Sequence, residues 1–265
     1  MMIDNDCRSE LTEIKRLASR QKLLSMHFHA GVGHIGGSLS CIDVLLVVFH
    51  DILCNCDRFI LSKGHSVGAL YVALWSIGRL KSDDLDAFYN EETLLAGHPP
   101  SQGISDILFA TGSLGHGFSL ACGTSLGMKL QKQDGRVICL TSDGEWQEGS
   151  TWEALIFASH RKLNNLTILV DHNGLQGFGR TNEVASMSPL WDKLKGFDVK
   201  VSVIEGHDIE VIRKTLLQPQ DKLHLIILKT VKGHGVSFMD DKMEWHYLPM
   251  NEAQYQIAFA EQEDL

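Results

Sequence analysis

Positive charge is scarce in this sequence and is not concentrated anywhere along it. The chain of 265 residues has 24 lysines and arginines against 33 aspartates and glutamates, which gives a formal net charge of −9 at pH 7. Proteins that bind nucleic acid through its phosphates need clustered lysine and arginine side chains. We therefore expect no nucleic-acid partner.

Long apolar runs are also missing. The run Val44 to Phe49 is far shorter than the roughly 20 residues that cross a bilayer as a helix. The first ten residues, MMIDNDCRSE, are polar and acidic and lack the apolar centre of a signal peptide. We expect a cytoplasmic protein with no membrane partner.

The cysteines do not follow a zinc or disulfide pattern. Cys54 and Cys56 are the only two that lie close together, and their CNC spacing differs from the CxxC of many zinc sites, with no further ligands nearby. Because most of the cysteines lie within apolar runs, we expect each to be a buried, reduced thiol. The six are Cys7, Cys41, Cys54, Cys56, Cys122 and Cys139.

Linker sequence is lacking as well. Only five residues are prolines, and no stretch rich in proline, glycine and serine divides the chain. Hydrophobic residues make up 44% of the sequence and charged residues 22%, which is typical of globular proteins and excludes an intrinsically disordered chain. We expect one domain over residues 1–265.

Apolar, β-branched runs alternate with helical patterns along the chain. Strands are predicted at 58–62, 136–143, 165–173, 199–204 and 223–230. Helices are predicted at 11–27, 65–78, 148–161 and 208–217, and after the glycine-rich segment 111–117. A further helix is predicted to begin at Ser40, which stands in capping-box register with Asp43. This alternation predicts an α/β fold, a doubly wound and mostly parallel sheet with helices on both faces.

Polar residues end two consecutive predicted strands, at the sheet edge where open parallel sheets bind ligands. Asp143 ends one strand, and Asn173 ends the next, thirty residues later. A carboxylate and an amide oxygen, with a loop carbonyl, suit Mg²⁺ or Ca²⁺, and Gly144 lets the backbone approach a phosphate. Either motif alone is better explained as a turn or a cap. The two together favour a site for a metal ion and a diphosphate.

Four histidines lie in loops beside glycine or proline rather than on apolar faces: His34 in GVGHIGG, His65 in SKGHS, His98 in AGHPP and His246 in EWHYLP. A single loop histidine is usually a surface residue or part of a turn. Four of them favour a polar pocket that binds a hydroxylated substrate and moves protons near neutral pH. The glycine-rich turn TGSLGHG (111–117) offers amides to a phosphate, but by itself it is equally consistent with a turn that has no ligand.

Together these motifs resemble the diphosphate-binding domain of transketolases, which belong to the thiamin diphosphate enzymes. The resemblance covers about residues 23–248 and rests on the Asp-Gly pair followed by asparagine and on the ordered loops GHIGG, SKGHS, AGHPP and TGSLGHG. It implies thiamin diphosphate and Mg²⁺ (or Ca²⁺) as cofactors. The implied metal ligands are the side chains of Asp143 and Asn173 and the carbonyl oxygen of Leu175.

The resemblance also implies roles for the other residues of the site. Contacts with the cofactor are implied for Gly112, Ser113, Leu114, Gly144, Glu148, Asn173, His65 and His246. Glu148 also resembles the residue that couples two active sites at a subunit contact. The implied catalytic residues are His34 and His98, which would hydrogen-bond the oxygens of the donor, and His65 and His246, which would support the diphosphate and the proton transfers. Two residues depart from the family pattern: Ser142 replaces a glycine, and His172 replaces an asparagine or aspartate.

Full-length transketolases continue into a pyrimidine-binding domain, whose glutamate activates the cofactor, and a C-terminal domain. The resemblance therefore implies the N-terminal subunit of a split transketolase, which functions with a C-terminal subunit in a 2+2 heterotetramer. Its reaction would transfer a two-carbon ketol unit from a ketose to an aldehyde or keto-sugar acceptor, with sugars or sugar phosphates as substrates. The alternatives are a subunit of another thiamin diphosphate enzyme that uses pyruvate or a 2-oxoacid, and a catalytically silent binding protein.

Overall fold

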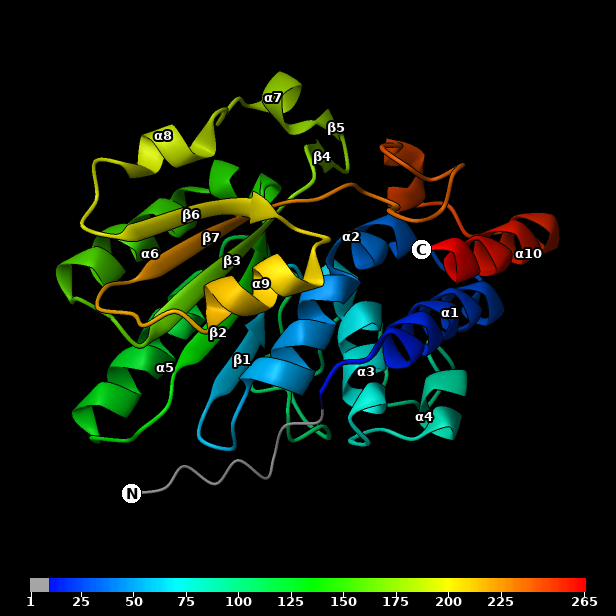
Figure 1. Ribbon diagram of the computed structural model, residues 1–265, viewed down its shortest axis with the longest axis horizontal. Coiled ribbons are helices and arrows are strands. Elements are labelled where there is room, and N and C mark those ends of the chain that lie inside the picture. The colour runs from blue at the N-terminus through cyan, green and yellow to red at the C-terminus, as the bar shows by residue number, and fades with distance from the viewer. Residues whose placement is uncertain (1–9) are drawn as a thin grey trace.

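Five parallel strands form the central sheet, in the order β1-β2-β3-β7-β6 (Figure 1). The computed structural model describes residues 10–265. The strands are β1 (Arg58–Leu61), β2 (Val137–Ser142), β3 (Leu166–His172), β6 (Lys200–Glu205) and β7 (His224–Lys229). A separate antiparallel hairpin consists of β4 (Leu175–Gln176) and β5 (Gly179–Arg180). The predicted α/β fold with a parallel sheet is confirmed.

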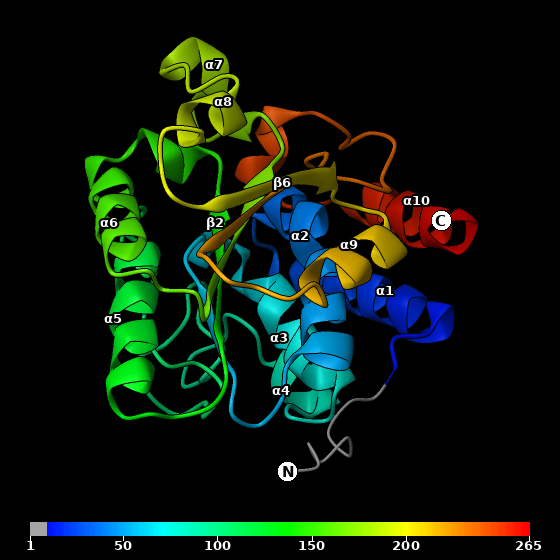
Figure 2. The same ribbon diagram turned by 60° about the vertical axis from the view of Figure 1, so that its left-hand side comes forward.

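Helices cover both faces of the sheet (Figure 2). Side chains alternate along each strand, so Ile138 and Leu140 pack into one apolar cluster and Val137 and Cys139 into the other. The helices of the first face are α1 (Glu13–Ala30), α2 (Ile35–Val47), α3 (Val67–Ser76) and α9 (Ile209–Leu216). Those of the second are α5 (Gly117–Leu130), α6 (Gly149–His160) and α8 (Leu190–Leu194).

Shorter elements complete the described part of the chain. The remaining α-helices are α4 (Ser82–Asp86), α7 (Thr181–Val184) and α10 (Glu252–Glu261), the last of which lies along α1 in both views (Figures 1 and 2). The π- and 3₁₀-helical turns are η2 (Val48–Ile52), η3 (Gly64–Ser66), η4 (Gly144–Gln147), η5 (Met243–His246) and η6 (Gln262–Asp264). Three of these turns, η3, η4 and η5, carry residues of the predicted site.

The start of α2 differs from the prediction, whereas the predicted strands and the helices with predicted bounds all occur within three residues of those bounds. Helix α2 begins at Ile35 rather than at Ser40, so Gly36 lies in its first turn. A Cβ atom at Gly36 would come within 3.1 Å of Trp245, so close packing explains this glycine. Ser40 does not cap a helix, because it lies inside α2 and its hydroxyl donates to Asp171 Oδ2 at 2.6 Å.

Asp43, the other residue of the predicted capping box, is buried where α1 packs on α2. Its carboxylate accepts hydrogen bonds from Arg16 Nε (2.9 Å), Arg20 Nη1 (3.2 Å) and His207 Nδ1 (3.1 Å). Burial alone would raise the pKa of Asp43, but Arg20, His207 and Arg16 hold it well below its usual range. The stability that this network contributes is therefore present above about pH 4 and is lost as the pH falls toward the pKa of the folded state.

Replacing Asp43 with alanine should lower the free energy of unfolding by about 3–5 kcal/mol, because Arg20 would stay buried without a counter-charge. Urea unfolding at pH 7 measures the change. Asp241→Ala is the matched control, since its ion pair with Arg180 is exposed and screened by water, so its loss should change the stability far less. Equal losses in the two variants would contradict a structural role for the buried network.

The predicted burial of the cysteines is confirmed for Cys41, Cys122 and Cys139. It is wrong for Cys56, which is exposed in the turn before β1. Asp57 closes this turn by accepting the Cys54 N–H at 3.0 Å, so the residues between them project outward. Cys54 is partly buried, and Cys7 lies outside the described residues.

One helical segment within residues 10–265 is long and apolar enough to cross a membrane by length and composition. It is Ile35–Ile52, with a mean hydropathy of 1.7. In the fold 94% of this segment is buried. A buried core helix passes the same test, so the segment is weak evidence for a membrane span.

Candidate active site

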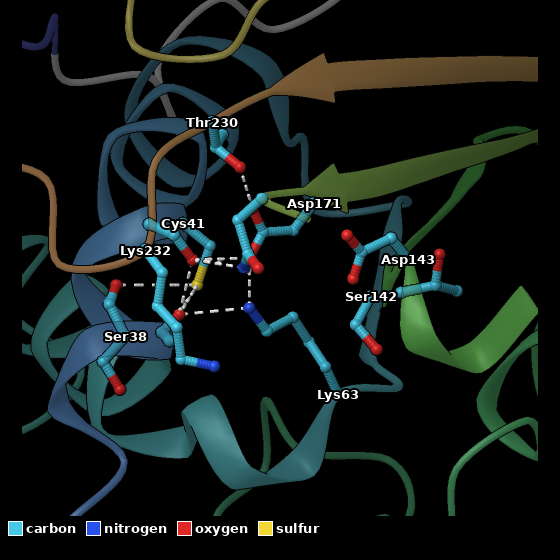
Figure 3. A network of polar contacts seen from close by, with 12 residues as sticks. Ser38, Cys41, Lys63, Ser142, Asp143, Asp171, Thr230 and Lys232 are labelled. Atoms are coloured by element: carbon cyan, nitrogen blue, oxygen red, sulfur yellow. Dashed lines mark hydrogen bonds and ion pairs between the residues drawn. The ribbon is translucent and has the colours of Figure 1, made fainter. Parts of the chain in front are cut away.

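The residues that follow β1, β2, β3 and β7 meet at the carboxyl edge of the sheet (Figure 3). Gly174 follows β3 and Asp143 follows β2, and the Gly174 N–H donates to Asp143 Oδ2 at 2.6 Å. Lys63, after β1, and Thr230, after β7, both donate to the carboxylate of Asp171 in β3. Four strand ends are thus joined by polar contacts in one place, at the edge where the sequence predicts the site.

Asp143 and Asn173 lie at neighbouring strand ends, as predicted. The Asp143 carboxylate accepts the backbone N–H groups of Gly144 (2.8 Å) and Gly174 (2.6 Å), which are its hydrogen-bond donors within residues 10–265. Asn173 Oδ1 accepts the N–H of Leu175 at 3.0 Å. Burial raises the pKa of Asp143 to about 6, because two amides compensate a buried charge only in part. A cation beside this carboxylate would stabilise its ionised form.

The donor set at these strand ends fits a divalent cation bound with a phosphate. A carboxylate, an amide oxygen and a main-chain carbonyl are hard oxygen ligands of the kind that Mg²⁺ and Ca²⁺ prefer. Beside them, Gln176 Nε2 is buried and has no hydrogen-bond partner in the described part of the chain. A Cβ atom at Gly144 would lie 3.2 Å from Gln176 Oε1, so glycine keeps this space open. Gln176 Nε2 is therefore free to donate a hydrogen bond to an oxygen atom of a ligand.

Asp171 orients Asn173. The Asn173 Nδ2 group donates to Asp171 Oδ2 at 3.3 Å and to Ser40 Oγ at 3.4 Å. Because the amide nitrogen is directed to these acceptors, the Oδ1 atom is left on the side of Leu175. Burial alone would raise the pKa of Asp171, but the ion pair with Lys63 lowers it, so this residue stays a carboxylate.

Sequence reasoning missed the buried ion pair of Lys63 with Asp171. Both side chains are at most 1% exposed, and Lys63 Nζ also donates to the Gly37 carbonyl at 3.0 Å. The signal was present in two places: Asp171 interrupts an otherwise apolar strand, and Lys63 stands beside the predicted His65. Their pairing was not visible, because 108 residues separate them along the chain.

Glu145 is a second buried acid that sequence reasoning missed. It accepts hydrogen bonds from Ser62 Oγ, from the Gly115 N–H at 2.9 Å and from the Ser142 N–H at 2.8 Å. It therefore ties the glycine-rich turn to the ends of β1 and β2, and its burial raises its pKa. Glu148 is exposed at the start of α6, and its predicted contacts with the cofactor and with a second subunit stay predictions.

The structure brings the four predicted histidines together. The ring centroid of His34 lies 5.1 Å from that of His246, 5.7 Å from that of His65 and 6.0 Å from that of His98. His65 and His246 are 5.2 Å apart. These rings come from four distant segments, and folding brings them into one cluster. The segments are the loop before α2, η3, the loop before the glycine-rich turn and η5.

Burial keeps this histidine cluster uncharged at neutral pH. It lowers the pKa of His34 to about 4 and that of His246 to about 3, with further lowering from neighbouring positive groups. The pKa of His65 falls well below its usual value for the same reason, and that of His98 is lowered as well. Neutral imidazoles each carry one N–H donor and one acceptor, so the cluster can hydrogen-bond carbonyl and hydroxyl oxygens.

The glycine-rich turn lies against the histidine cluster. At Gly112 the backbone has φ +143°, and a Cβ atom there would come within 2.7 Å of the His98 ring. Ser113 is exposed and Leu114 is half-buried, while Gly115 is fixed by Glu145. The predicted contact of residues 112–114 with a cofactor stays a prediction, and the glycine is explained by the close approach of His98.

The two departures from the family pattern have different surroundings. Ser142 is buried, and its hydroxyl donates a hydrogen bond to Glu145 Oε2 at 3.4 Å. His172 projects to the side opposite Asp171 and Asn173, because side chains alternate along a strand. With Asp143 and Gly174 it lines a cavity of about 180 Å³, and its ring centroid lies 6.0 Å from that of Trp191. His172 is therefore beside Asp143 but away from the histidine cluster.

The chain belongs to the family described as "Transketolase, thiamine diphosphate binding domain", whose profile matches residues 14–260. An apulose-4-phosphate transketolase subunit of Phocaeicola vulgatus is 36% identical over 264 residues, with 95% of this chain and 94% of the relative covered. The 6-deoxy-6-sulfo-D-fructose transketolase subunit SqwG of a Clostridium species is 36% identical over 245 residues, covering 88% of this chain and 89% of the relative.

Solved structures support the same family. The crystal structure of transketolase from Campylobacter jejuni superposes with a TM-score of 0.87 at 27% sequence identity and covers 96% of this chain. The chain spans only 43% of that transketolase. The expectation of an N-terminal transketolase subunit is therefore confirmed at the level of family and fold, and relatives of similar length are named as transketolase subunits.

Proposed function

We propose that this chain is the diphosphate-binding subunit of a two-subunit transketolase, which transfers a two-carbon ketol unit from a ketose donor to an aldehyde or keto-sugar acceptor. One observation carries the proposal. The Asp143 and Asn173 pair and the cluster of four histidines lie at the same edge of the sheet, in a chain whose relatives of similar length are named as transketolase subunits.

Mg²⁺ and thiamin diphosphate are the proposed cofactors. Asp143, Asn173 and the Leu175 carbonyl would hold the metal ion, and Gln176 Nε2 would donate to a diphosphate oxygen in the space that Gly144 leaves open. When bound, thiamin diphosphate supplies the electron sink for carbon–carbon bond cleavage. This chain would hold the diphosphate end of that group.

The histidine cluster would bind the donor sugar. His34 and His98 have ring centroids 6.0 Å apart, and their neutral N–H groups would donate to the carbonyl and hydroxyl oxygens of the ketose, where negative charge develops. His65 and His246 would support the diphosphate. Two relatives carry apulose 4-phosphate and 6-deoxy-6-sulfofructose in their names, which supports a ketose with an anionic group as the substrate class.

A second subunit with a pyrimidine-binding domain is the proposed partner, in a 2+2 heterotetramer. An apolar rim beside the site would contact it. Phe178, at the tip of the β4–β5 hairpin, is 86% exposed. The neighbouring Tyr247 donates its hydroxyl to the Gly177 carbonyl at 3.1 Å, and Leu248 is also exposed. Large apolar side chains exposed together beside a site are typical of a docking surface.

Replacing Phe178 with serine should weaken association with the partner subunit by about 10-fold or more, because an exposed aromatic anchor would be lost. Biolayer interferometry with the purified partner measures the affinity. Ile14→Ser is the control, since Ile14 is 81% exposed on α1, away from the carboxyl edge of the sheet. Similar affinities for both variants would place the partner on another surface.

The proposed function is tested by purifying the tagged chain from its own cells with Mg²⁺ and thiamin diphosphate, followed by native mass spectrometry and a ketol-transfer assay. A heteromer that contains the cofactor and transfers a ketol unit supports the proposal. Activity with pyruvate as the donor would instead indicate another thiamin diphosphate enzyme. An assembly of this chain alone that binds no cofactor would indicate a silent relative.

A further inference from the structure

Lys232, in the segment that follows β7, is a buried lysine with an unusual partner. Its side chain is 2% exposed. The other two buried basic side chains within residues 10–265 are paired with carboxylates, Arg20 with Asp43 and Lys63 with Asp171. No carboxylate of the described chain lies within ion-pair distance of Lys232. Its Nζ atom instead lies 3.0 Å from His246 Nδ1.

The fold places Lys232 firmly beside the site. Its carbonyl accepts the Asp241 N–H at 2.9 Å, and the next residue, Gly233, donates to the Gly36 carbonyl in α2 at 2.9 Å. A Cβ atom at Gly36 would come within 3.2 Å of Lys232 Cγ, so this glycine makes room for the lysine stem. Figure 3 shows the Lys232 side chain beside that of Lys63, and the two side chains come from different segments of the protein.

The contact between Lys232 and His246 has a defined direction. An ammonium group has three donors and no acceptor, so the His246 Nδ1 atom must accept the hydrogen bond. The proton of the neutral imidazole is then on Nε2. The Nε2 atom lies 3.5 Å from the Cβ position at Gly177, in the hairpin that follows the proposed metal ligand Leu175, and no hydrogen bond to it occurs in the described residues. Its donor is therefore available to a ligand.

We propose that Lys232 is a positioning residue that keeps the His246 ring uncharged and holds its proton on Nε2. The ring then offers a hydrogen-bond donor, rather than an acceptor, to an oxyanion of the ligand. The identity of that ligand rests on the proposed function, but the state of the ring does not. The ionisable groups around His246 are Lys232, Lys63, His34 and His65, with Tyr247 next to it in sequence.

Electrostatics agrees with this geometry. Burial lowers the pKa of Lys232 to about 8, so the ammonium form still predominates at pH 7. Burial is also the largest cause of the low pKa of His246, and Lys232 is the next. Removing the lysine charge should therefore let the pKa of His246 rise.

The test is nuclear magnetic resonance of the cofactor-free chain labelled with ¹⁵N-histidine, with His246 assigned by the variant His246→Gln. The wild-type spectrum at pH 7 should show an unprotonated Nδ1 and a protonated Nε2. In Lys232→Met, which keeps the apolar stem, the shifts should become those of a tautomer mixture, and the pKa of His246 should rise by about one unit or more. Lys232→Arg should restore the wild-type pattern, and Lys242→Met, at an exposed lysine of the same segment, should leave it unchanged.

Two results would overturn the proposal: a wild-type His246 with its proton on Nδ1, or an unchanged tautomer and pKa in Lys232→Met. The wild-type measurement alone is decisive if the methionine variant fails to fold. Because the spectra are recorded without cofactor or partner, they are independent of the proposed transketolase activity. With the partner subunit present, Lys232→Met should lower turnover about 10-fold, whereas a failure of the whole reaction in the wild type would count against the proposed function only.

Discussion

Replacing Asp143 with asparagine should weaken Mg²⁺-dependent binding of thiamin diphosphate by about 100-fold or more. This carboxylate is buried, its hydrogen-bond donors within the described chain are two amides, and it makes no ion pair there. A divalent cation is what such a carboxylate lacks. Asparagine keeps the size of the side chain and one oxygen acceptor, so the loops at Gly144 and Gly174 should stay in place while the anionic ligand is lost.

Isothermal titration calorimetry with and without Mg²⁺ measures this loss, and circular dichroism checks that the variant is folded. Asp198→Asn is the matched control, because Asp198 is exposed in an ion pair with Lys222. Affinity of Asp143→Asn within a factor of about two of the wild type would remove Asp143 from the metal site and, with it, the proposed position of the diphosphate.

Replacing His98 with alanine should lower turnover by about 100- to 1,000-fold and leave the affinity for thiamin diphosphate nearly unchanged. His98 packs against the glycine-rich turn at Gly112 and lies edge-on to His34, at 6.0 Å between ring centroids. It is exposed, whereas His65 and His246 are partly buried. We therefore expect it to contact the sugar rather than the diphosphate.

Steady-state kinetics of the reconstituted enzyme separates the two effects. His160→Ala is the control, since His160 is an exposed histidine at the end of α6. Normal turnover in His98→Ala would exclude a catalytic role for His98. Loss of cofactor binding in the same variant would show that the ring supports the glycine-rich turn instead.

The central sheet is predictable because its strands are short apolar runs. Strands that pair in the sheet also follow one another, or nearly so, in the order of the strands along the chain. Each run ends in polar residues, and parallel strands bring those ends to one edge. Asp143 and Asn173 can therefore be placed together from the amino-acid sequence alone. The start of α2 cannot be predicted in this way. A glycine such as Gly36 usually indicates the end of a helix, whereas in the fold it makes room for Trp245 and Lys232.

The same limit applies to the buried charges. Lys63 and Asp171 are 108 residues apart, and Ser62 and Glu145 are 83 apart, so no local pattern links them. Their roles follow from burial, because a charged group removed from water is stable only with a specific partner. The position of His172 is a similar case. The alternation of side chains at the end of β3 decides whether its ring lies on the same side as Asp171 and Asn173 or on the opposite side.

By itself, the sequence determined the fold class, the family and the residue types at the site, because periodicity and short motifs are local properties of a chain. Only the tertiary structure decided which groups are paired, which are charged and which are exposed. The exposure of Glu148, the burial of Glu145 and the contact of Lys232 with His246 all depend on segments that meet only when the chain folds. Burial and distance set the energy of a charged group, and both are properties of the packed molecule.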